Sequence, residues 1–389
     1  MNSEPGPKSS DVSVSRNETT GISKRTLTQF DCICIIVGTI IGAGVFKVPS
    51  VVASMVPDIF SLILVWSLGG LVALIGALCF AELTTTYPDR GGDYGYLKRA
   101  FGRRVGFAFS WCAFWIVRPA NIGLMSLIFG EFAAKALPGT LPMLNFAILA
   151  IVIVSGFNLI GVTVGKTAQN VLTVAKVIGI LLIVFSPFLL GGQPELKGQP
   201  NTIAVSASQN LDANAPSATT TDDAPENDSQ ETSAQPGWFW LAMVLVMFTY
   251  GGWNDIAFVA SEVQEPKRNL FRSLVLGTLL VLAVYLLVNL ALLLGLGFAA
   301  MGSLGGNATS ELVRKGMGPI GNRVLSALVC VSCLGSINAM IFTSPRIYWA
   351  TATDYSALSW LAGGREEHGG EQCCCRRLLR CYSLSLIHI

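Results

Sequence analysis

The sequence predicts an all-α membrane protein, a bundle of about eight spanning helices in which the first and the sixth are broken. Composition is the first observation behind this prediction. Hydrophobic residues make up 52% of the 389 residues, charged residues only 13%, and there are 40 glycines. Such a chain is too apolar for an ordinary soluble protein. The second observation is that glycines cluster inside two of the apolar segments, at 38–44 and 251–252.

Eight apolar segments are long enough to cross a bilayer as helices. They run approximately over 30–53, 60–87, 105–135, 143–163, 168–190, 238–260, 272–299 and 321–352. Residues 1–29 are polar and rich in Ser, Thr and Asn, without the early apolar stretch of a signal peptide. We expect them to form a disordered tail.

Basic residues in the loops predict the orientation of the bundle. Lys24 and Arg25 precede the first span and further basic residues crowd the loop after the second, whereas the loop at 137–144 carries no charge. Because cytoplasmic loops are enriched in Lys and Arg, the N-terminus is expected in the cytoplasm. The acidic, Ser/Thr-rich loop 191–237 would then face outside as a disordered segment. The prediction is a multi-pass protein of the plasma membrane.

The first broken segment reads GTIIGAGVF, from Gly38 to Phe46. Glycine is a poor helix former and adopts conformations that other residues avoid. Backbone that leaves the helical hydrogen-bonding pattern is tolerated at membrane depth only where it lines a cavity or a ligand site. A glycine-broken span is therefore typical of a transporter.

The second broken segment reads FTYGGWND, from Phe248 to Asp255. Paired broken helices in corresponding positions indicate a substrate site near the bilayer midplane. Freed N–H groups at the start of a half-helix suit a carboxylate, and freed carbonyl groups suit an ammonium. Close helix packing is the alternative explanation for each glycine cluster taken alone.

Several motifs, in this order and spacing, resemble the L-type amino acid transporters of the amino acid–polyamine–organocation superfamily. They are GTIIGAGVF at 38–46, GALCFAEL at 76–83, GGDYGYL at 91–97, Arg118-Pro119, YGGWN at 250–254 and FTSPR at 342–346. The resemblance implies a LeuT-like bundle of two inverted five-helix repeats that works by alternating access, with no covalent chemistry and no cofactor.

The same resemblance implies the domain organisation. The first repeat would occupy 30–190 and a partial second repeat 238–352. Because members of the family carry about twelve spans, the chain is expected to be C-terminally truncated. Residues 353–389, with a Cys/Arg-rich stretch, would form a tail whose last part is non-native.

The family pattern implies a substrate site at the two breaks. The first break would hold the substrate carboxylate with the backbone of Ile40, Ile41, Gly42, Ala43 and Gly44. Relatives often have Ser where this chain has Ala43, so one hydroxyl contact is missing.

The second break would bind the substrate ammonium. Phe248, Thr249 and Gly251 would supply carbonyl groups, Phe248 would also act as a gate, and Asn254 would line the same site. No metal ligand is expected among them.

Lys176 lies inside the fifth apolar segment, where an unpaired ammonium is costly. It could extend toward the interface. In sodium-independent members of the family, a lysine at the matching position resembles a tethered substitute for a sodium ion. Ser336 and Asn338 in the eighth span are its expected neighbours. The prediction is transport without sodium.

Gly251 also bears on substrate charge, because relatives that accept cations tend to have Asp there. Glycine favours neutral, large or apolar L-amino acids. Asp255, four residues on, is either a counter-charge in the same site or the cap of the second half-helix, and the cap is favoured. Arg118 within the third span requires a partner that the sequence does not identify. A cationic amino acid or polyamine carrier of the same fold, or a non-transporting fragment, remains the alternative.

Other classes of function have little support. A net charge of +2 gives no reason to expect nucleic acid binding, and two histidines with scattered cysteines do not form a metal-site pattern. No conjunction of nucleophile, base and oxyanion donors suggests an enzyme. The expected partners are an amino acid substrate and the lipid bilayer. Heavy-chain-linked relatives carry a cysteine in the loop that here spans 137–144, which has none, so no disulfide-linked heavy chain is expected.

Overall fold

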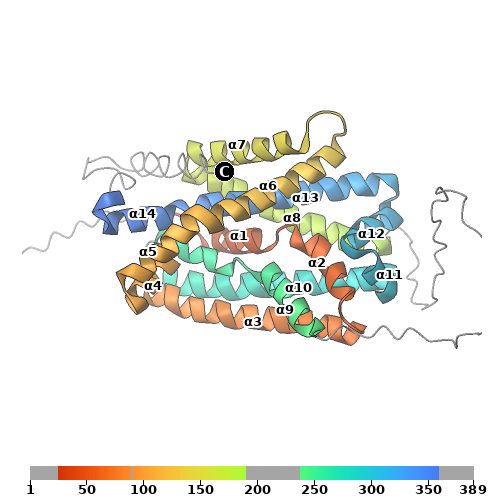
Figure 1. Cartoon of the computed structure of the whole chain (residues 1–389), viewed down its shortest axis with the longest axis horizontal. Coiled ribbons are helices and arrows are strands. Elements are labelled where there is room, and N and C mark those ends of the chain that lie inside the picture. The colour runs from red at the N-terminus through yellow and green to blue at the C-terminus, as the bar shows by residue number, and fades with distance from the viewer. Residues whose placement is uncertain (1–24, 89–90, 190–236, 359–389) are drawn as a thin grey trace, which may run out of the picture.

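The computed structural model describes residues 25–88, 91–189 and 237–358, and the regular elements in these ranges are helices that run broadly along one long axis (Figure 1). Seven helical segments are long and apolar enough to cross a membrane, or eight if a bent pair at the N-terminal end counts as one span. The predicted all-helical bundle of eight spans is confirmed.

Each predicted span corresponds to one helix or to two or three consecutive ones. They are α1 (Gln29–Ile40) with α2 (Gly44–Ala53); α3 (Ile59–Thr86); α5 (Arg103–Cys112) with the π-helical turn η1 (Ala113–Val117) and α6 (Arg118–Ala136); α7 (Met143–Ile160); α8 (Val162–Leu189); α9 (Trp238–Tyr250) with the 3-10 helix η2 (Trp253–Glu262); α10 (Pro266–Leu296); and α13 (Pro319–Thr343) with α14 (Pro345–Asp354).

Short helices that were not predicted occupy the loops. They are α4 (Asp93–Phe101), α11 (Phe298–Ser303), η3 (Gly305–Asn307), α12 (Ala308–Met317) and η4 (Ser356–Leu358). Helices α4 and α14 lie at one end of the bundle, and α11 and α12 lie at the other (Figure 1). We refer to these as the α4 end and the α12 end.

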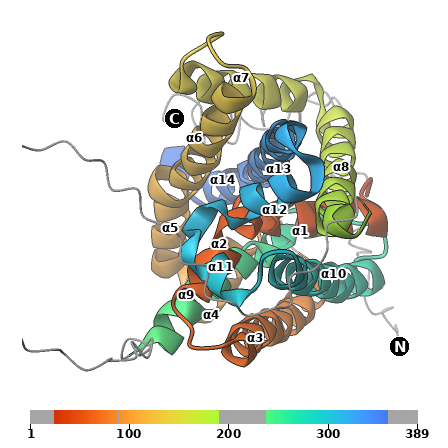
Figure 2. The same ribbon diagram turned by 90° about the vertical axis from the view of Figure 1, so that its right-hand side faces the viewer.

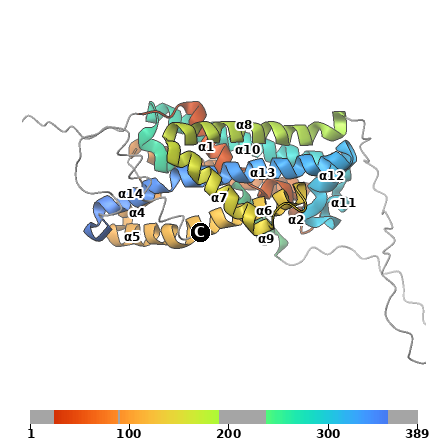
Figure 3. The same ribbon diagram turned by 90° about the horizontal axis from the view of Figure 1, so that it is seen from above.

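The first span lies at the centre of the bundle. Viewed along the bundle, α1 and α2 are surrounded by α3, α8, α10 and α13 (Figure 2), and α8, α10 and α13 run alongside α1 (Figure 3). Three aromatic side chains, Trp66, Tyr250 and Tyr285, pack together beside it with ring centroids 4.9 to 6.0 Å apart. The first half of the broken span is thus packed among longer helices, whereas α2 lies mainly against η3, α9 and α11.

The outer surface of the bundle is apolar. Large hydrophobic side chains are exposed along α3, α6, α7 and α8, for example Leu71, Ile148, Val152 and Leu182. A soluble protein would not expose such continuous apolar faces, whereas a lipid-facing surface requires them.

The boundaries of the predicted tails differ in one detail. Within the predicted tail 1–29, Leu27 is fully buried and exchanges backbone hydrogen bonds with the chain around Val263. Thr28 then caps α1 in a reciprocal capping box with Asp31. Most of the predicted tail 1–29, nearly all of the loop 191–237 and the tail from 359 lie outside the described residues.

Candidate functional site

The first break separates two helices whose axes differ by 48°. Helix α1 ends at Ile40, and Ile41 leaves the helical conformation with φ −76° and ψ 87°. Helix α2 begins at Gly44 with Ala43 as its N-cap, and no side chain caps its first turn. The carbonyl end of one helix and the N–H end of another therefore meet at Ile41 to Ala43, in the buried centre of the bundle.

Lys176 of α8 binds the carbonyl end of α1. Its side chain is fully buried, and Nζ donates hydrogen bonds to the carbonyl oxygen of Gly38 at 2.9 Å and to that of Ile41. The last carbonyl groups of a helix carry partial negative charge, so a cation at this position is favoured. The ammonium therefore satisfies backbone groups that the break leaves without helical partners.

Two hydroxyl groups of α13 complete the ring of donors around these carbonyls. Ser336 Oγ donates to Gly38 at 3.0 Å, as its predicted place beside Lys176 requires. Ser332 Oγ lies 3.1 Å from both the Ile41 and the Gly42 carbonyl oxygens. Ser332 was not predicted, although it lies one helical turn before Ser336 and so on the same face of α13.

Asn338 is not a neighbour of the Lys176 ammonium, and this expectation was wrong. Its amide donates to the carbonyl of Gly165 at 3.1 Å and to Gln169 Oε1 at 2.8 Å, and accepts from Asn158. Two residues along a helix are separated by about 200°, so Asn338 and Ser336 face different sides of α13. Asn338 instead joins α13 to α7 and α8.

A stripe of polar side chains on α8 faces α1 and leads to Lys176. Each member makes a hydrogen bond to α1: Lys166 and Asn170 to the Asp31 carboxylate, Gln169 and Thr173 to the Cys34 carbonyl, and Lys176 to the Gly38 carbonyl. The three- and four-residue spacing of these positions was a signal available in the sequence. The polar stripe thus bonds α8 to α1 at Asp31, Cys34 and Gly38.

The second break lies directly against the first. Helix α9 ends at Tyr250, Gly251 is extended and Gly252 has φ +112°, after which the chain continues as the 3-10 helix η2. A Cβ atom on Gly252 would lie 2.9 Å from Thr39 Cγ2, so only glycine permits this approach of the two spans. The predicted pair of broken helices is thus brought together.

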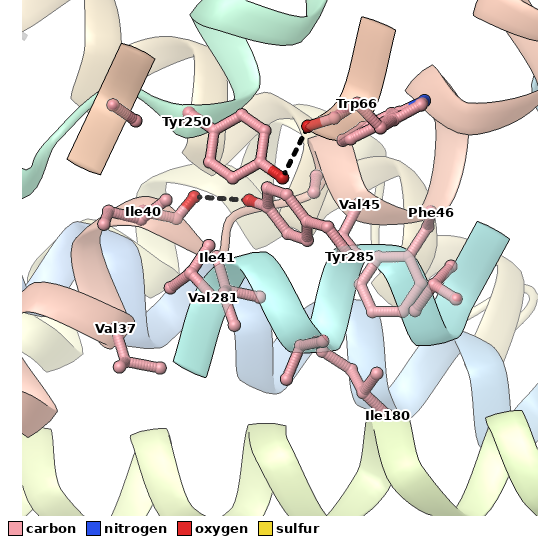
Figure 4. Packing of buried hydrophobic residues seen from close by; sticks show 14 of the residues in the cluster. Val37, Ile40, Ile41, Val45, Phe46, Trp66, Ile180, Tyr250, Val281 and Tyr285 are labelled. Carbon is pink, nitrogen blue, oxygen red and sulfur yellow. Dashed lines mark hydrogen bonds between the residues drawn. The ribbon is translucent and has the colours of Figure 1, made fainter. Parts of the chain in front are cut away.

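Tyr285 of α10 connects both breaks (Figure 4). Its hydroxyl lies 3.2 Å from the carbonyl oxygen of Ile40 and 2.9 Å from that of Thr249. Figure 4 shows the bond to Ile40 and the ring of Tyr285 beside Tyr250, whose own hydroxyl donates to the carbonyl of Trp66. Tyr285 was missed, because nothing in α10 itself marks one tyrosine as a partner of two other helices.

Two predicted residues of the second break point elsewhere. Phe248 is 66% exposed and lies on the same exposed face of α9 as Leu241 and Val244, so its role as a gate stays a prediction. Asn254 donates from Nδ2 to Asp93 Oδ2 at 2.9 Å, which directs its side chain to α4. Gly251 is exposed beside the break, and its N–H bonds back to Phe248.

Asp255 is an ion-pair partner, and the favoured interpretation of it as a helix cap was wrong. Both of its oxygens accept hydrogen bonds of 2.8 Å from the guanidinium of Arg118 on α6. Both side chains are buried, and no side chain caps the first turn of η2. This bidentate contact also supplies the partner that Arg118 required. It joins the third span to η2, the second half of the sixth span.

Two broken helices meet at the centre of a helical bundle, an arrangement typical of secondary transporters. A family model described as amino acid permease matches residues 27–367. The chain belongs to this family, and the resemblance to L-type transporters is confirmed.

The relatives are similar over most of this chain. The b(0,+)-type amino acid transporter 1 of Mus musculus is 28% identical over 344 residues, which cover 85% of this chain and 63% of the relative. The serine/threonine exchanger SteT of Bacillus subtilis is 30% identical over 336 residues, covering 86% and 69%. The large neutral amino acids transporter small subunit 2 of Oryctolagus cuniculus is 28% identical over 335 residues, covering 84% and 58%. The chain thus spans about 63% of the length of the first of these relatives.

A solved structure supports the fold. A Na⁺-coupled sialic acid symporter in a substrate-bound outward-open state aligns with a TM-score of 0.55 and 11% sequence identity, covering 94% of this chain and 75% of the symporter. At this identity the likeness concerns the helical architecture alone.

Proposed function

We propose that this chain is a secondary-active amino acid transporter that moves neutral, large or apolar L-amino acids by alternating access. One observation carries the proposal: the two broken spans lie against each other, with Gly252 of one next to Thr39 of the other. The uncapped first turn of α2 would receive the substrate carboxylate, and the carbonyl end of α9 would receive the ammonium.

The charges near the site favour a neutral substrate. Gly251 carries no counter-charge for a cationic side chain. The nearby Asp255 is already neutralised by Arg118 through two hydrogen bonds. Asp255 is therefore not free to serve as a counter-charge for a cationic amino acid or polyamine.

Transport is expected to need no sodium. Lys176 places its ammonium on the Gly38 carbonyl, with the Ser336 hydroxyl as a second donor to the same oxygen. A sodium ion binds such carbonyl oxygens, and here a tethered cation occupies them. Lys176 would thus supply a fixed charge in place of an ion.

The test is uptake into proteoliposomes that contain the purified chain. Labelled leucine is expected to accumulate or exchange equally in sodium and in choline buffer, with excess unlabelled leucine competing and arginine not competing. Competition by arginine would favour the cationic alternative, and dependence on sodium would refute the role given to Lys176. Absence of any uptake, with the chain folded, would favour the non-transporting fragment.

We also propose that the α4 end faces the cytoplasm in the plasma membrane, and that no heavy chain is linked by a disulfide. Basic residues near α4 and α5, such as Lys98, Arg99 and Arg103, support the orientation. The connection between α6 and α7, residues 137–142, contains no cysteine. Non-reducing electrophoresis from a native membrane would reveal a reducible larger species if the second statement were wrong.

A further inference from the structure

Asp93, the first residue of α4, is half-buried, and its carboxylate has an incomplete hydrogen-bonding environment. Its Oδ2 accepts a hydrogen bond from Asn254 of η2, whereas Oδ1 is buried and has no hydrogen-bond partner among the described residues. A Cβ on the preceding Gly92 would lie 2.7 Å from the ring of Phe258. The start of α4 therefore packs closely against η2, the second half of the sixth span.

The charges around Asp93 do not balance. Among the described residues, the charged groups that act on it are Asp255 from η2 and Arg118 from α6. From α14, Tyr348 lies near Arg118. Two carboxylates and one guanidinium give these three described residues a net charge of −1 when all are ionised. Such an excess is unfavourable, and a single proton removes it.

The acid–base chemistry of Asp93 agrees with this count. Burial raises the pKa of its carboxyl to about 6, and the negative charge of Asp255 acts in the same direction. The hydrogen bond from Asn254 and the charge of Arg118 oppose the rise. A carboxyl of this kind changes its protonation state near the pH of a cell, whereas an exposed aspartate does not.

We propose that Asp93 is a proton-binding site, and that its proton neutralises the cluster of Asp93, Arg118 and Asp255 and thereby favours the packing of α4 against η2. With the proton bound, the two carboxyl groups no longer repel each other across this contact. Without the proton, the repulsion and the buried charge favour separation of α4 from η2, where water would reach Asp93.

The consequence for transport rests on the proposed function. If η2 moves away from α4 when the α4 end opens, the pKa of Asp93 falls toward its ordinary value and the proton is released. Proton binding and the closing of this end are then linked, since each favours the other. The additional ligand is a proton, which is released when the α4 end opens.

The test is an infrared titration of the purified full chain in lipid nanodiscs, without substrate, from about pH 8 to about pH 4.5. The C=O stretching band of a protonated carboxylic acid is expected to grow in with a midpoint near 6, to be lost in Asp93→Asn, and to persist in Asp58→Asn. Asp58 is the matched control, because it is an exposed aspartate at the N-cap of α3.

A second variant keeps the test decisive if Asp93→Asn does not fold. Asn254→Ala removes a hydrogen bond to the charged form of Asp93, so the midpoint of the band is expected to move upward. A band unchanged in Asp93→Asn, or an unmoved midpoint in folded Asn254→Ala, would overturn the proposal. Leucine exchange at about pH 5.5 and about pH 8 is measured separately, so absent transport refutes the proposed function while the titration still decides the proton site.

Discussion

The ammonium nitrogen of Lys176 lies 2.9 Å from the carbonyl oxygen of Gly38, in the last turn of α1 before the first break. The two residues come from different spans, and the polar stripe of α8 leads to this contact turn by turn. A buried charge is thus balanced by helix carbonyl groups, and the broken end of α1 gains partners that its own helix does not provide.

Replacing Lys176 by methionine tests this contact. The variant keeps an unbranched side chain, one atom shorter, and removes a charge-assisted donor from two carbonyl groups, each bond contributing about 1.5–3 kcal/mol. We expect leucine exchange to fall at least about tenfold and the melting temperature in detergent to decrease. Lys135→Met is the control, because Lys135 is largely exposed and contacts Glu131 and Phe132 of its own helix. Equal activity of Lys176→Met and the unchanged chain would contradict the assignment.

Replacing Tyr285 by phenylalanine removes the hydroxyl between the two breaks. The carbonyl groups of Ile40 and Thr249 lose a buried donor, at a cost of about 1–3 kcal/mol. Tyr250→Phe removes a similarly buried hydroxyl that contacts α3 instead. Both variants should lose comparable stability in thermal unfolding, but only Tyr285→Phe should reduce exchange several-fold. If the two variants lost the same activity, Tyr285 would have no special place at the breaks.

The ion pair of Arg118 and Asp255 makes a double-mutant test possible. Asp255→Leu alone leaves a buried guanidinium without its carboxylate and should destabilise the fold by about 3–5 kcal/mol. Adding Arg118→Met should recover most of this loss, because an apolar pair of similar volume avoids the desolvation of two charges. Chemical unfolding of the two single variants and the double variant measures the coupling. Additive losses would show that the contact is not energetically coupled.

Gly252 tests the approach of the two spans. Gly252→Ala places a methyl group 2.9 Å from Thr39 and forces a left-handed conformation on a residue with a side chain. The expected cost of the backbone strain is about 1–3 kcal/mol, with loss of exchange. Gly156→Ala in α7 is the control, because nothing lies within 4 Å of the added carbon, and it should be neutral or slightly stabilising. A well-folded, fully active Gly252→Ala protein would show that the spans need not touch.

The breaks and the fold class could be predicted from the sequence because their causes are local. Runs of apolar residues determine the spans, and the clusters around Gly42 and Gly251 interrupt them wherever the surrounding helices lie. The 3-10 conformation of η2 was not predictable in this way. Runs of that length are uncommon, and η2 lies packed among α1, α3 and α10, of which α1 and α3 are distant from it in sequence.

The wrong predictions for Asn338 and Asp255 have a different physical origin. Both predictions rest on neighbours in sequence, whereas the partners of the two side chains lie on other helices. Asp255 pairs with a residue 137 positions away. Asn338 was grouped with Ser336 by proximity, although helical geometry places Ser332 on that face. The four-residue spacing along a helix is sufficient to predict Ser332 beside Ser336. It cannot predict Arg118 as the partner of Asp255, because the two residues lie on different helices.

The contacts of Tyr285 have one more consequence. A phenol carries a single proton, so its hydroxyl makes one full hydrogen bond at a time, and the carbonyl oxygens of Ile40 and Thr249 compete for it. If the first and sixth spans separate during a transport cycle, one carbonyl oxygen can move away while the other keeps the hydrogen bond from the hydroxyl. Helix α10 then stays bonded to one broken span in every stage, and the hydroxyl is never left without an acceptor.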